Sequence, residues 1–385
     1  MKAVGLMSGT SADGIDAALV EIQSDPIRMR LVIFDVFPYP RALQKSLITL
    51  AEGAAVSDLC HLNFYLGELL ADAVIRIARR ANVPLSKIAL IGSHGQTVHH
   101  LPTPKRAGKW AIRSTLQIGE PSVIAERTGV TTVADFRPRD MAAGGEGAPL
   151  TPYLHFHLFS SPHVSRAVVN IGGISNLTFL TAGAPLEGTR AFDAGPGNML
   201  IDGIVRALTR GREKMDREGK RARRGRVHAG LLGEMMRHPF IRKAPPKSTG
   251  REAFGQAMVE KMLQRGARLR LTPDDSIATA TALTAAAIAE HVRRFAPAPP
   301  DELIACGGGV HNRALMENLA EALAPVPVRV SDALGYPSRA IEAMTFALLA
   351  YQTWHNQPTN LPYVTGARHP VVLGKIIPGH LPVPS

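Results

Sequence analysis

An eight-residue segment near the N-terminus, Gly9–Asp16, combines glycines, hydroxyls and carboxylates in a pattern that suits phosphate chemistry. Its sequence is Gly-Thr-Ser-Ala-Asp-Gly-Ile-Asp. Glycines allow a tight turn whose N–H groups approach an anion, hydroxyls add donors, and aspartates can hold a magnesium ion. Phosphoryl transfer depends on such positioning and charge neutralisation. The segment lacks the GxxxxGK[ST] pattern, and taken alone it also fits an ordinary hairpin turn.

Two more glycine-rich turns could serve the same chemistry. Asn170–Asn176 follows one apolar run, and Cys306–Asn312 joins a second apolar run to an expected helix whose N-terminus would favour negative charge. Each turn is a weak signal alone, but the three together indicate a nucleotide bound in a cleft between two domains. The expected nucleotide contacts are Gly9, Thr10, Ser11, Ala12, Asp13, Gly14, Ile15, Asp16, Asn170, Gly172, Gly173, Asn176, Gly307, Gly308, Gly309 and Asn312, with Asp13 and Asp16 as the Mg²⁺ ligands.

The elements that must position these turns alternate between strands and helices. The apolar patterns predict strands over 3–7, 17–22, 31–37, 87–91, 166–171, 177–180 and 302–305, and helices over 60–81, 199–208 and 277–295. The strand–glycine turn–strand device of the N-terminus recurs at 166–180, which suggests two related domains. Residues 193–198 are expected to form a loop before a helix. The alternation indicates an α/β fold.

Length and composition narrow the class of protein. The 385 residues exceed what one hydrophobic core usually serves. Cys60 and Cys306 have no paired spacing, so a reduced cytoplasmic setting is expected, and we identify neither a signal peptide nor a membrane span. The net charge is +12, of which residues 210–226 supply +6 from nine Lys/Arg and three Asp/Glu. No aromatic residues interleave with this basic segment, so a solvated or substrate-attracting loop is expected rather than a nucleic-acid site.

The chain resembles the anhydro-N-acetylmuramic acid kinase family, within the sugar kinase, Hsp70 and actin superfamily. The matching stretches follow the family's order over essentially the whole chain. They are Gly5–Asp16, Ser93–Thr97, Gln117–Pro121, Ala134–Arg137, Gly144–Leu150, Asn170–Asn176, Phe192–Asn198, Pro245–Glu252, Cys306–Asn312, Glu342–Ala347 and Val364–Ala367.

The resemblance implies an ATP-dependent sugar kinase with two actin-like (ribonuclease H-like) domains and an active-site cleft between them. The first domain would span 1–135, completed by about 346–385, and the second 136–345. The implied reaction transfers the γ-phosphate of ATP to O6 of 1,6-anhydro-N-acetylmuramic acid while water attacks C1 and opens the anhydro bridge. The resemblance also implies a homodimer, a small amino-sugar substrate, a role in peptidoglycan recycling, and neither nucleic-acid nor membrane partners.

Two carboxylates match the family's catalytic positions. Opening the bridge needs a general base near C1, as in an inverting glycosidase. Asp193 matches the catalytic aspartate of the Phe-Asp-x-Gly-Pro-Gly-Asn motif, and it lies too far before the helix near Asn198 to be a simple N-cap. Glu342 matches a glutamate near the sugar, although alone it also fits a solvated residue at a helix start.

Residues 93–97 are expected to line the sugar pocket, with His94, Gln96 and Thr97 as substrate contacts. The spacing of His94, His99 and His100 does not place three imidazoles together, so no metal is expected there. Arg127 and Arg137 are both candidates for the lactyl carboxylate of muramic acid, and the sequence does not decide between them.

Three positions depart from the family pattern. Ala12 stands where methionine is usual, Ala194 replaces a common threonine, and residues 220–226 are more basic than usual. These changes affect packing, one hydroxyl contact and the surface. Two other functions stay open: a kinase for another amino sugar, which would need no water-activating base, and a non-enzymatic binder that uses residues 210–226.

Overall fold

The computed structural model describes residues 1–9, 13–53 and 55–384, and these form two compact units. The first unit comprises residues 1–158 and 339–385, and the second comprises residues 159–338. Thr10, Ser11 and Ala12 of the first glycine turn lie outside the described residues. Each unit is built on one sheet with helices packed against it, which confirms the expected α/β class.

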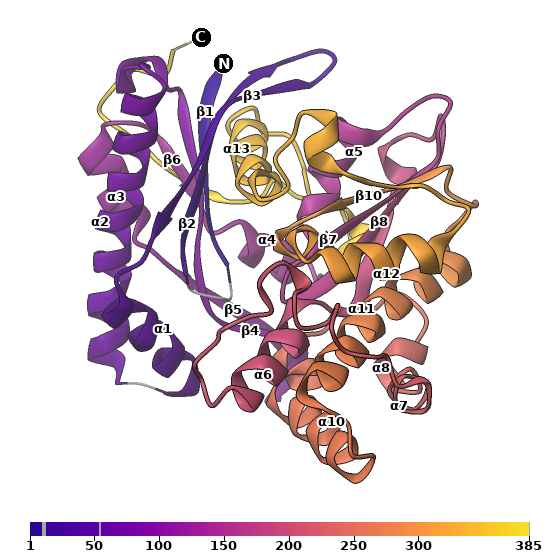
Figure 1. Ribbon diagram of the computed structural model, residues 1–385. Helices are drawn as coiled ribbons and strands as arrows, with labels where there is room; N and C mark the ends of the chain where they lie inside the picture. The colour runs from indigo at the N-terminus through magenta and orange to yellow at the C-terminus, as the bar shows by residue number, and fades with distance from the viewer. Residues whose placement is uncertain (10–12, 54, 385) are drawn as a thin grey trace. The chain divides into compact units, whose positions relative to one another are not determined.

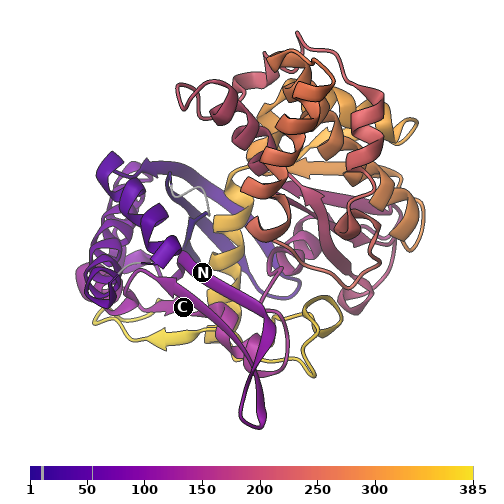
Figure 2. The same cartoon turned by 90° about the horizontal axis from the view of Figure 1, so that it is seen from below.

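The sheet of the first unit has the strand order β12-β6-β4-β1-β2-β3, with β5 paired to β4. Strands β1, β2 and β3 form an antiparallel meander, whereas β4 lies parallel to β1 and β6 parallel to β4. Figure 2 shows the ribbon of β4 and β5 extending beyond the rest of this sheet. The bounds are β1 Lys2–Ser8, β2 Gly14–Gln23, β3 Arg28–Pro38, β4 Leu90–Ala107, β5 Trp110–Ile118, β6 Thr132–Ala134 and β12 Lys375–Ile377.

Helices cover both faces of this sheet, with α2 and α3 on one side and α13 on the other (Figure 1). The core between α2 and the meander contains Leu6, Leu19, Leu66, Leu70 and Ile77, all at most 1% exposed. The helices are α1 Arg41–Gly53, α2 Val56–Arg80, α3 Pro121–Thr128, α4 Phe136–Ala142, α5 Thr151–Phe159, α13 Ala340–Trp354 and α14 Pro362–Thr365, with a 3-10 turn at Leu85–Lys87.

The sheet of the second unit repeats this plan in the order β11-β10-β7-β8-β9. Strands β7, β8 and β9 form the antiparallel meander, and β10 and β11 continue it in parallel from β7. The recurring strand–turn–strand pattern in the sequence therefore marks two units whose sheets share one plan. The bounds are β7 Arg166–Ile171, β8 Ile174–Leu180, β9 Arg190–Pro196, β10 Glu302–Cys306 and β11 Val328–Val330.

Helix α11 is the central helix of the second unit. It begins with a capping box between Thr272 and Asp275, and its Ala- and Thr-rich sequence is buried along most of its length. It contributes to two hydrophobic cores, one of them with α6 and α10 and the other with the sheet. The helices are α6 Asn198–Leu208, α7 Ala229–Met235, α8 Pro239–Arg242, α9 Arg251–Phe254, α10 Gln256–Arg268, α11 Pro273–Phe295 and α12 Arg313–Leu323, with 3-10 turns at Leu186–Gly188, Arg217–Gly219, Gly308–His311 and Ser331–Leu334.

The chain passes between the units at different residues from those expected. Residues 136–158, expected in the second domain, belong to the first unit, and the return to the first unit comes at Arg339 rather than near 346. Side-chain contacts explain the first difference. Phe136 stacks on Phe346, and Tyr153 is hydrogen-bonded to Gln352, so α4 and α5 pack with α13.

Among the described residues, no helix is both long enough and apolar enough to cross a membrane.

Candidate active site

Helix α13 packs closely against strands β1 and β4 because two glycines leave room for its backbone. Gly5 of β1 and Gly92 of β4 are paired across the parallel ladder. A Cβ on Gly5 would overlap the carbonyl oxygen of Ala343, and one on Gly92 would overlap that of Phe346. The first turn of α13, which carries Glu342, is therefore positioned by backbone packing against β1 and β4.

The ends of the first glycine turn are tied together by Ser8 and Gln96. The Ser8 hydroxyl lies 2.6 Å from Gln96 Oε1 and 3.2 Å from the carbonyl oxygen of Gly14. The Gln96 amide donates to the carbonyl oxygen of Gly9 at 3.2 Å, and the Tyr39 hydroxyl donates to Ser8 at 3.0 Å. Gln96, expected to contact sugar, thus also binds Gly9, the first residue of the segment expected to contact phosphate.

Asp16 stands in a cluster of charged groups on the first unit. Its Oδ1 accepts a hydrogen bond from Arg339 Nη2 at 2.9 Å. Burial raises the pKa of Asp16 to about 6, Arg339 lowers it, and the carboxylates of Glu342 and Asp13 raise it again. Ile15, its neighbour in the turn, is 1% exposed and packs in the core.

This cluster fits a magnesium ion, which is usually held by one or two carboxylates together with substrate phosphates. Burial is the main cause of the raised pKa of Asp16, and the nearby carboxylates of Glu342 and Asp13 add to it, so a divalent cation would stabilise the ionised form. Within the part of the chain that the structure describes, no three His, Cys, Asp or Glu side chains are grouped as a complete metal site.

His94 is a buried hydrogen-bond acceptor that orients Arg137. Its Nδ1 lies 2.9 Å from the Gly95 carbonyl oxygen, which can only accept, so Nδ1 carries the proton and Nε2 accepts from Arg137 Nε at 3.0 Å. Burial, together with the charge of Arg137, lowers the pKa of His94 to about 3. The imidazole is therefore neutral near pH 7.

Arg137 is itself half-buried in the first unit. Its Nη1 donates to the Gly147 carbonyl oxygen at 2.7 Å. Burial lowers its pKa to about 10, and the carboxylates of Glu342 and Asp140 raise it. Arg137, Glu342 and His94 thus form one electrostatic group together with Asp16.

Asp140 is a structural residue of this region that sequence reasoning missed. Its Oδ2 accepts from the Gly147 amide at 2.8 Å, and its Oδ1 accepts from Asn360 and Thr365 at 2.8 and 2.7 Å. A Cβ on Gly145 would overlap this carboxylate. Its position four residues before the Gly144-Gly145 pair was the available signal.

Arg127 and Thr97 lie in different surroundings from Arg137. Arg127, on α3, makes a two-pronged ion pair with Glu68 of α2 at 2.7–3.1 Å, and both side chains are exposed. Thr97 Oγ1 accepts from Gln117 Nε2 at 3.2 Å at the base of the β4–β5 ribbon. The structure therefore brings Arg137, and not Arg127, together with His94.

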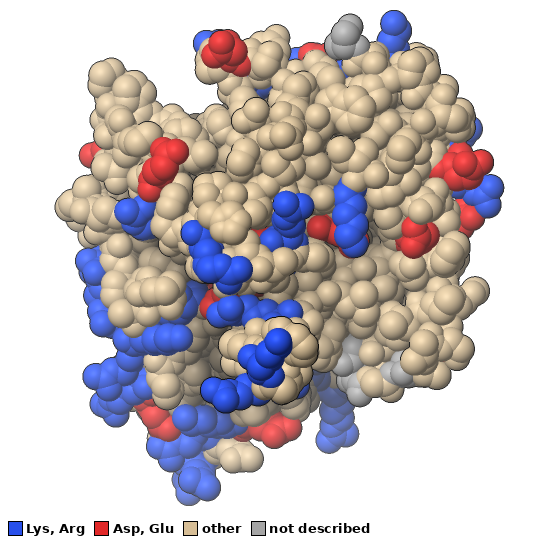
Figure 3. Space-filling model, turned by 180° about the vertical axis from the view of Figure 1, so that it is seen from behind, with Lys and Arg blue, Asp and Glu red and all other residues tan. Residues whose placement is uncertain are grey.

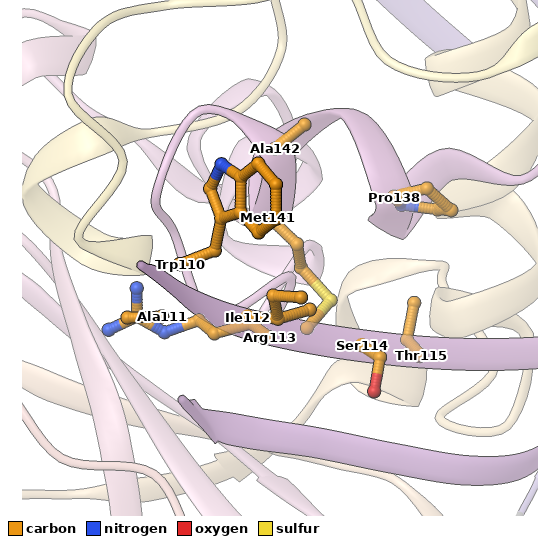
Figure 4. A pocket seen from close by; sticks show the side chains of 9 residues that line it. All are labelled: Trp110, Ala111, Ile112, Arg113, Ser114, Thr115, Pro138, Met141 and Ala142. Carbon is orange, nitrogen blue, oxygen red and sulfur yellow. The ribbon is translucent and has the colours of Figure 1, made fainter. Parts of the chain in front are cut away.

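A shallow pocket of about 510 Å³ lies between β5 and α4 (Figure 4). In Figure 4 the indole of Trp110 lies beside Met141 and Ala142. Arg113 connects the ribbon to the neighbouring loop, because its Nε donates to Pro102 and its Nη1 to Gly144. The pocket borders the loop that Arg137 also holds.

In the second unit, Asp193 lies within strand β9 rather than in the expected loop. Strand pairing with β8 continues to Pro196, opposite Ile174, and α6 begins at Asn198. The Asp193 amide donates to the Lys247 carbonyl oxygen at 3.2 Å, and the Thr249 amide donates to Asp193 Oδ2 at 2.8 Å. The carboxylate is thus oriented by a strand on one side and by residues 247–249 on the other.

The turn between β7 and β8 closes onto the start of α6. Amides of Asn198 and Met199 donate to the carbonyl oxygens of Gly172 and Gly173 at 2.8 and 3.1 Å. A Cβ on Gly197 would overlap the Gly172 carbonyl oxygen. Asn176, also expected at the nucleotide, is paired with Asp193 across β8 and β9.

The third glycine turn packs against the second. A Cβ on Gly307 would overlap the Asn170 side chain, and one on Gly309 would overlap Ile171. Gly308 has more space, since its nearest neighbour would be Asn198 at 3.9 Å. Asn312 caps α12 by accepting from the Leu315 amide at 3.1 Å, so its side chain serves the helix start. Asn170 and the glycines of both turns are therefore adjacent in the second unit.

The basic segment 210–226 is held by ion pairs. Asp216 accepts from the amides of Arg221 and Ala222 at 2.8 and 2.9 Å. Arg221 pairs with Glu213 and Asp274. Figure 3 shows one face of the molecule, on which Lys and Arg side chains gather over one part.

Comparison with known proteins identifies the family. The family model described as anhydro-N-acetylmuramic acid kinase matches residues 1–379. Proteins of that name from Caldanaerobacter subterraneus, Gloeobacter violaceus and Salinibacter ruber are 45%, 44% and 43% identical, over 97–98% of this chain and 96–98% of theirs. Among solved structures, a ROK family glucokinase from Streptomyces griseus aligns with a TM-score of 0.40 at 14% identity, over 91% of this chain and 100% of that one. On the full-length sequence match, the chain belongs to the anhydro-N-acetylmuramic acid kinase family.

Proposed function

We propose that the chain converts 1,6-anhydro-N-acetylmuramic acid, ATP and water to N-acetylmuramic acid 6-phosphate and ADP. The observation that carries this proposal is the family match over residues 1–379, with relatives of that name up to 45% identical. A water oxygen bonds to C1 as the C1–O6 bond breaks, and O6 takes the γ-phosphoryl group. A carboxylate accepts the proton of the water.

Asp193 is our candidate for that base. The Thr249 amide holds its Oδ2 at 2.8 Å, so the direction of the carboxylate is fixed before substrate arrives. Such preorganisation is what general base catalysis on a bound water requires. O6 leaves with a phosphoryl group and needs no proton, so one base suffices.

Arg137 is our candidate for the lactyl carboxylate of the sugar, with Glu342 as the assisting carboxylate. The structure supports Arg137 over Arg127, since the Arg127 guanidinium is already paired with Glu68 at the surface. His94 keeps Arg137 in place by accepting from its Nε. Gln96 and Thr97, on the same strand as His94, would contact the sugar hydroxyls.

ATP would be held by the three glycine turns, and Mg²⁺ by Asp13 and Asp16. When bound, Mg²⁺ would neutralise the charge that develops on the transferred phosphoryl group. Arg339 neutralises Asp16 in the absence of the ion, at 2.9 Å. We further propose that the enzyme acts as a cytoplasmic homodimer in peptidoglycan recycling, as the family resemblance implies.

A panel of sugars tests the proposal. Purified protein with Mg-ATP is incubated with the 1,6-anhydro sugar, N-acetylmuramic acid and N-acetylglucosamine, and phosphorylated products are identified by mass spectrometry. The proposal expects turnover of the anhydro sugar that Asp193→Asn abolishes. Preferred turnover of another amino sugar, retained in Asp193→Asn, would instead establish the alternative kinase.

A further inference from the structure

The segment that orients Asp193 has no regular secondary structure of its own. Residues 247–250 lie in neither helix nor strand, yet they supply a carbonyl oxygen to the Asp193 amide and an amide to its carboxylate. Such a segment is held by its backbone contacts and by the side chains that it buries. A buried side-chain anchor within it therefore contributes to the geometry of Asp193.

That anchor is the side chain of Lys247, which is only 4% exposed. Its Nζ donates to the Phe240 carbonyl oxygen at 2.9 Å and lies 2.5 Å from His291 Nε2. The ammonium also faces three aromatic rings, with Nζ 4.7 Å from the centroid of Phe240 and 5.8 Å from those of Phe192 and Phe295. Cation–π contact and two hydrogen bonds together compensate for burying the charge.

The side chain of His291 is oriented to accept a hydrogen bond from the ammonium of Lys247. Its Nδ1 lies 2.5 Å from the Ala287 carbonyl oxygen one turn earlier on α11, so Nδ1 carries the proton and Nε2 presents its lone pair to Lys247. Burial lowers the pKa of His291 to about 4, which keeps it neutral. Phe192, whose ring lies 5.8 Å from that of His291, directly precedes Asp193.

The charge on Lys247 also interacts with Asp193. Burial is the main cause that lowers the pKa of Lys247 to about 8; Arg294 and Lys243 contribute in the same direction, and Asp193 opposes them. The lysine is thus mostly protonated at neutral pH, and the carboxylate is one of the groups that keep it so.

We propose that Lys247 is a positioning residue for Asp193. Its ammonium, locked between His291, the Phe240 carbonyl and the aromatic rings, fixes residues 247–249, and their backbone in turn fixes the carboxylate. The inference rests on the proposed role of Asp193 as base. It assigns Lys247 no contact with substrate.

The test compares Lys247→Met with Lys243→Met in the full chain. Methionine keeps the length and apolar stem of Lys247 but removes the donors, whereas Lys243 is an exposed lysine nearby whose loss leaves the anchor intact. We expect Lys247→Met to lower kcat by about 100-fold, the scale of a 1 Å misplacement. The KM values for sugar and ATP should stay within about threefold, and Lys243→Met should match the wild type.

Amide hydrogen exchange supplies a readout that needs no substrate. In Lys247→Met the Thr249 amide, which donates to Asp193, should exchange faster, while amides of α11 keep their protection. Unchanged kcat, or unchanged Thr249 exchange in a folded Lys247→Met protein, would overturn the proposal. If the wild-type protein makes no product, or if Asp193→Asn is fully active, the proposed function is wrong. The exchange rate of the Thr249 amide still tests whether Lys247 positions Asp193.

A second pair of variants covers the case in which Lys247→Met does not fold. His291→Gln keeps an acceptor near the position of Nε2, and His291→Leu removes it. We expect kcat to survive in His291→Gln and to fall with Thr249 protection in His291→Leu. Equal kcat in the two variants would overturn the proposal.

Discussion

Gly5 and Gly92 are partners across the parallel β1–β4 pair, and α13 packs its backbone directly against both. Added methyl groups there would meet carbonyl oxygens of the helix, which cannot move aside as a flexible side chain can. The placement of Glu342 in the first turn of α13 thus depends on two residues that have no side chains.

Gly5→Ala is expected to destabilise the first unit by about 1–3 kcal/mol, the usual cost of overpacking a core. It should also lower activity, because α13 must shift away from β1. Calorimetric unfolding and kcat measure the two effects. The matched control is Gly233→Ala, an exposed helical glycine with open space around it, which should stabilise by about 0.5–1 kcal/mol. A fully stable, active Gly5→Ala protein would contradict the packing argument.

His94 makes stability depend on pH in a defined window. Its pKa is about 3 in the folded state and about 6.5 unfolded, so the unfolded chain binds the extra proton between these values. Stability therefore rises with pH from about 3 to 6.5, by up to about 1.4 kcal/mol per pH unit for this group, and is lost on acidification.

Unfolding measured at pH 7 and 5 should show a smaller acid loss in His94→Gln, which keeps an acceptor for Arg137 but no titrating ring. The exposed His61 provides the control, because His61→Gln should leave the pH dependence unchanged. An identical acid loss in wild type and His94→Gln would show that His94 is protonated in the folded enzyme.

Arg137 and Arg127 are a natural pair for testing sugar recognition. Arg137→Lys should raise the KM for the sugar by about 10- to 100-fold, since a charged hydrogen bond contributes about 1.5–3 kcal/mol, and should leave the KM for ATP unchanged. Arg127→Lys should change neither value, because its partner is Glu68 on the surface. A higher KM for the sugar in Arg127→Lys than in Arg137→Lys would instead indicate that Arg127 binds the lactyl carboxylate.

Arg339 and Mg²⁺ are expected to compete for Asp16. At pH 8, where a carboxyl of pKa about 6 is ionised, Arg339→Gln should lower the Mg²⁺ concentration needed for half-maximal activity. Asp16→Asn should raise it. Titrations of Mg²⁺ at saturating ATP and sugar measure both, and a higher requirement in Arg339→Gln would show that Arg339 assists the ion.

Much of the fold could be predicted because its strands are short apolar runs closed by glycine turns. The repeat of strand, glycine turn and strand at 3–22 and 166–180 correctly predicted two related units. The boundary near 136–158 could not be placed, since α4 and α5 owe their position to contacts with Phe346 and Gln352, some two hundred residues later.

The site was only partly predictable for the same reason. Motif order suggested Asp193, Glu342 and Arg137, but only tertiary packing reveals that His94 accepts from Arg137 and that Arg127 faces Glu68. Lys247 lies in the Pro245–Glu252 stretch that matches the family, but the sequence assigned it no role. Its burial against His291 depends on a helix that begins 26 residues later, and local pattern carries no such information.

The coupling of phosphorylation to hydrolysis is the central claim, and product isotope analysis in oxygen-18 water tests it most directly. Purified protein, Mg-ATP and 1,6-anhydro-N-acetylmuramic acid should give a 6-phosphate with one heavy oxygen at C1, and Asp193→Asn should give none. A phosphorylated product without heavy oxygen at C1, or no product beside an active control enzyme, would contradict the account.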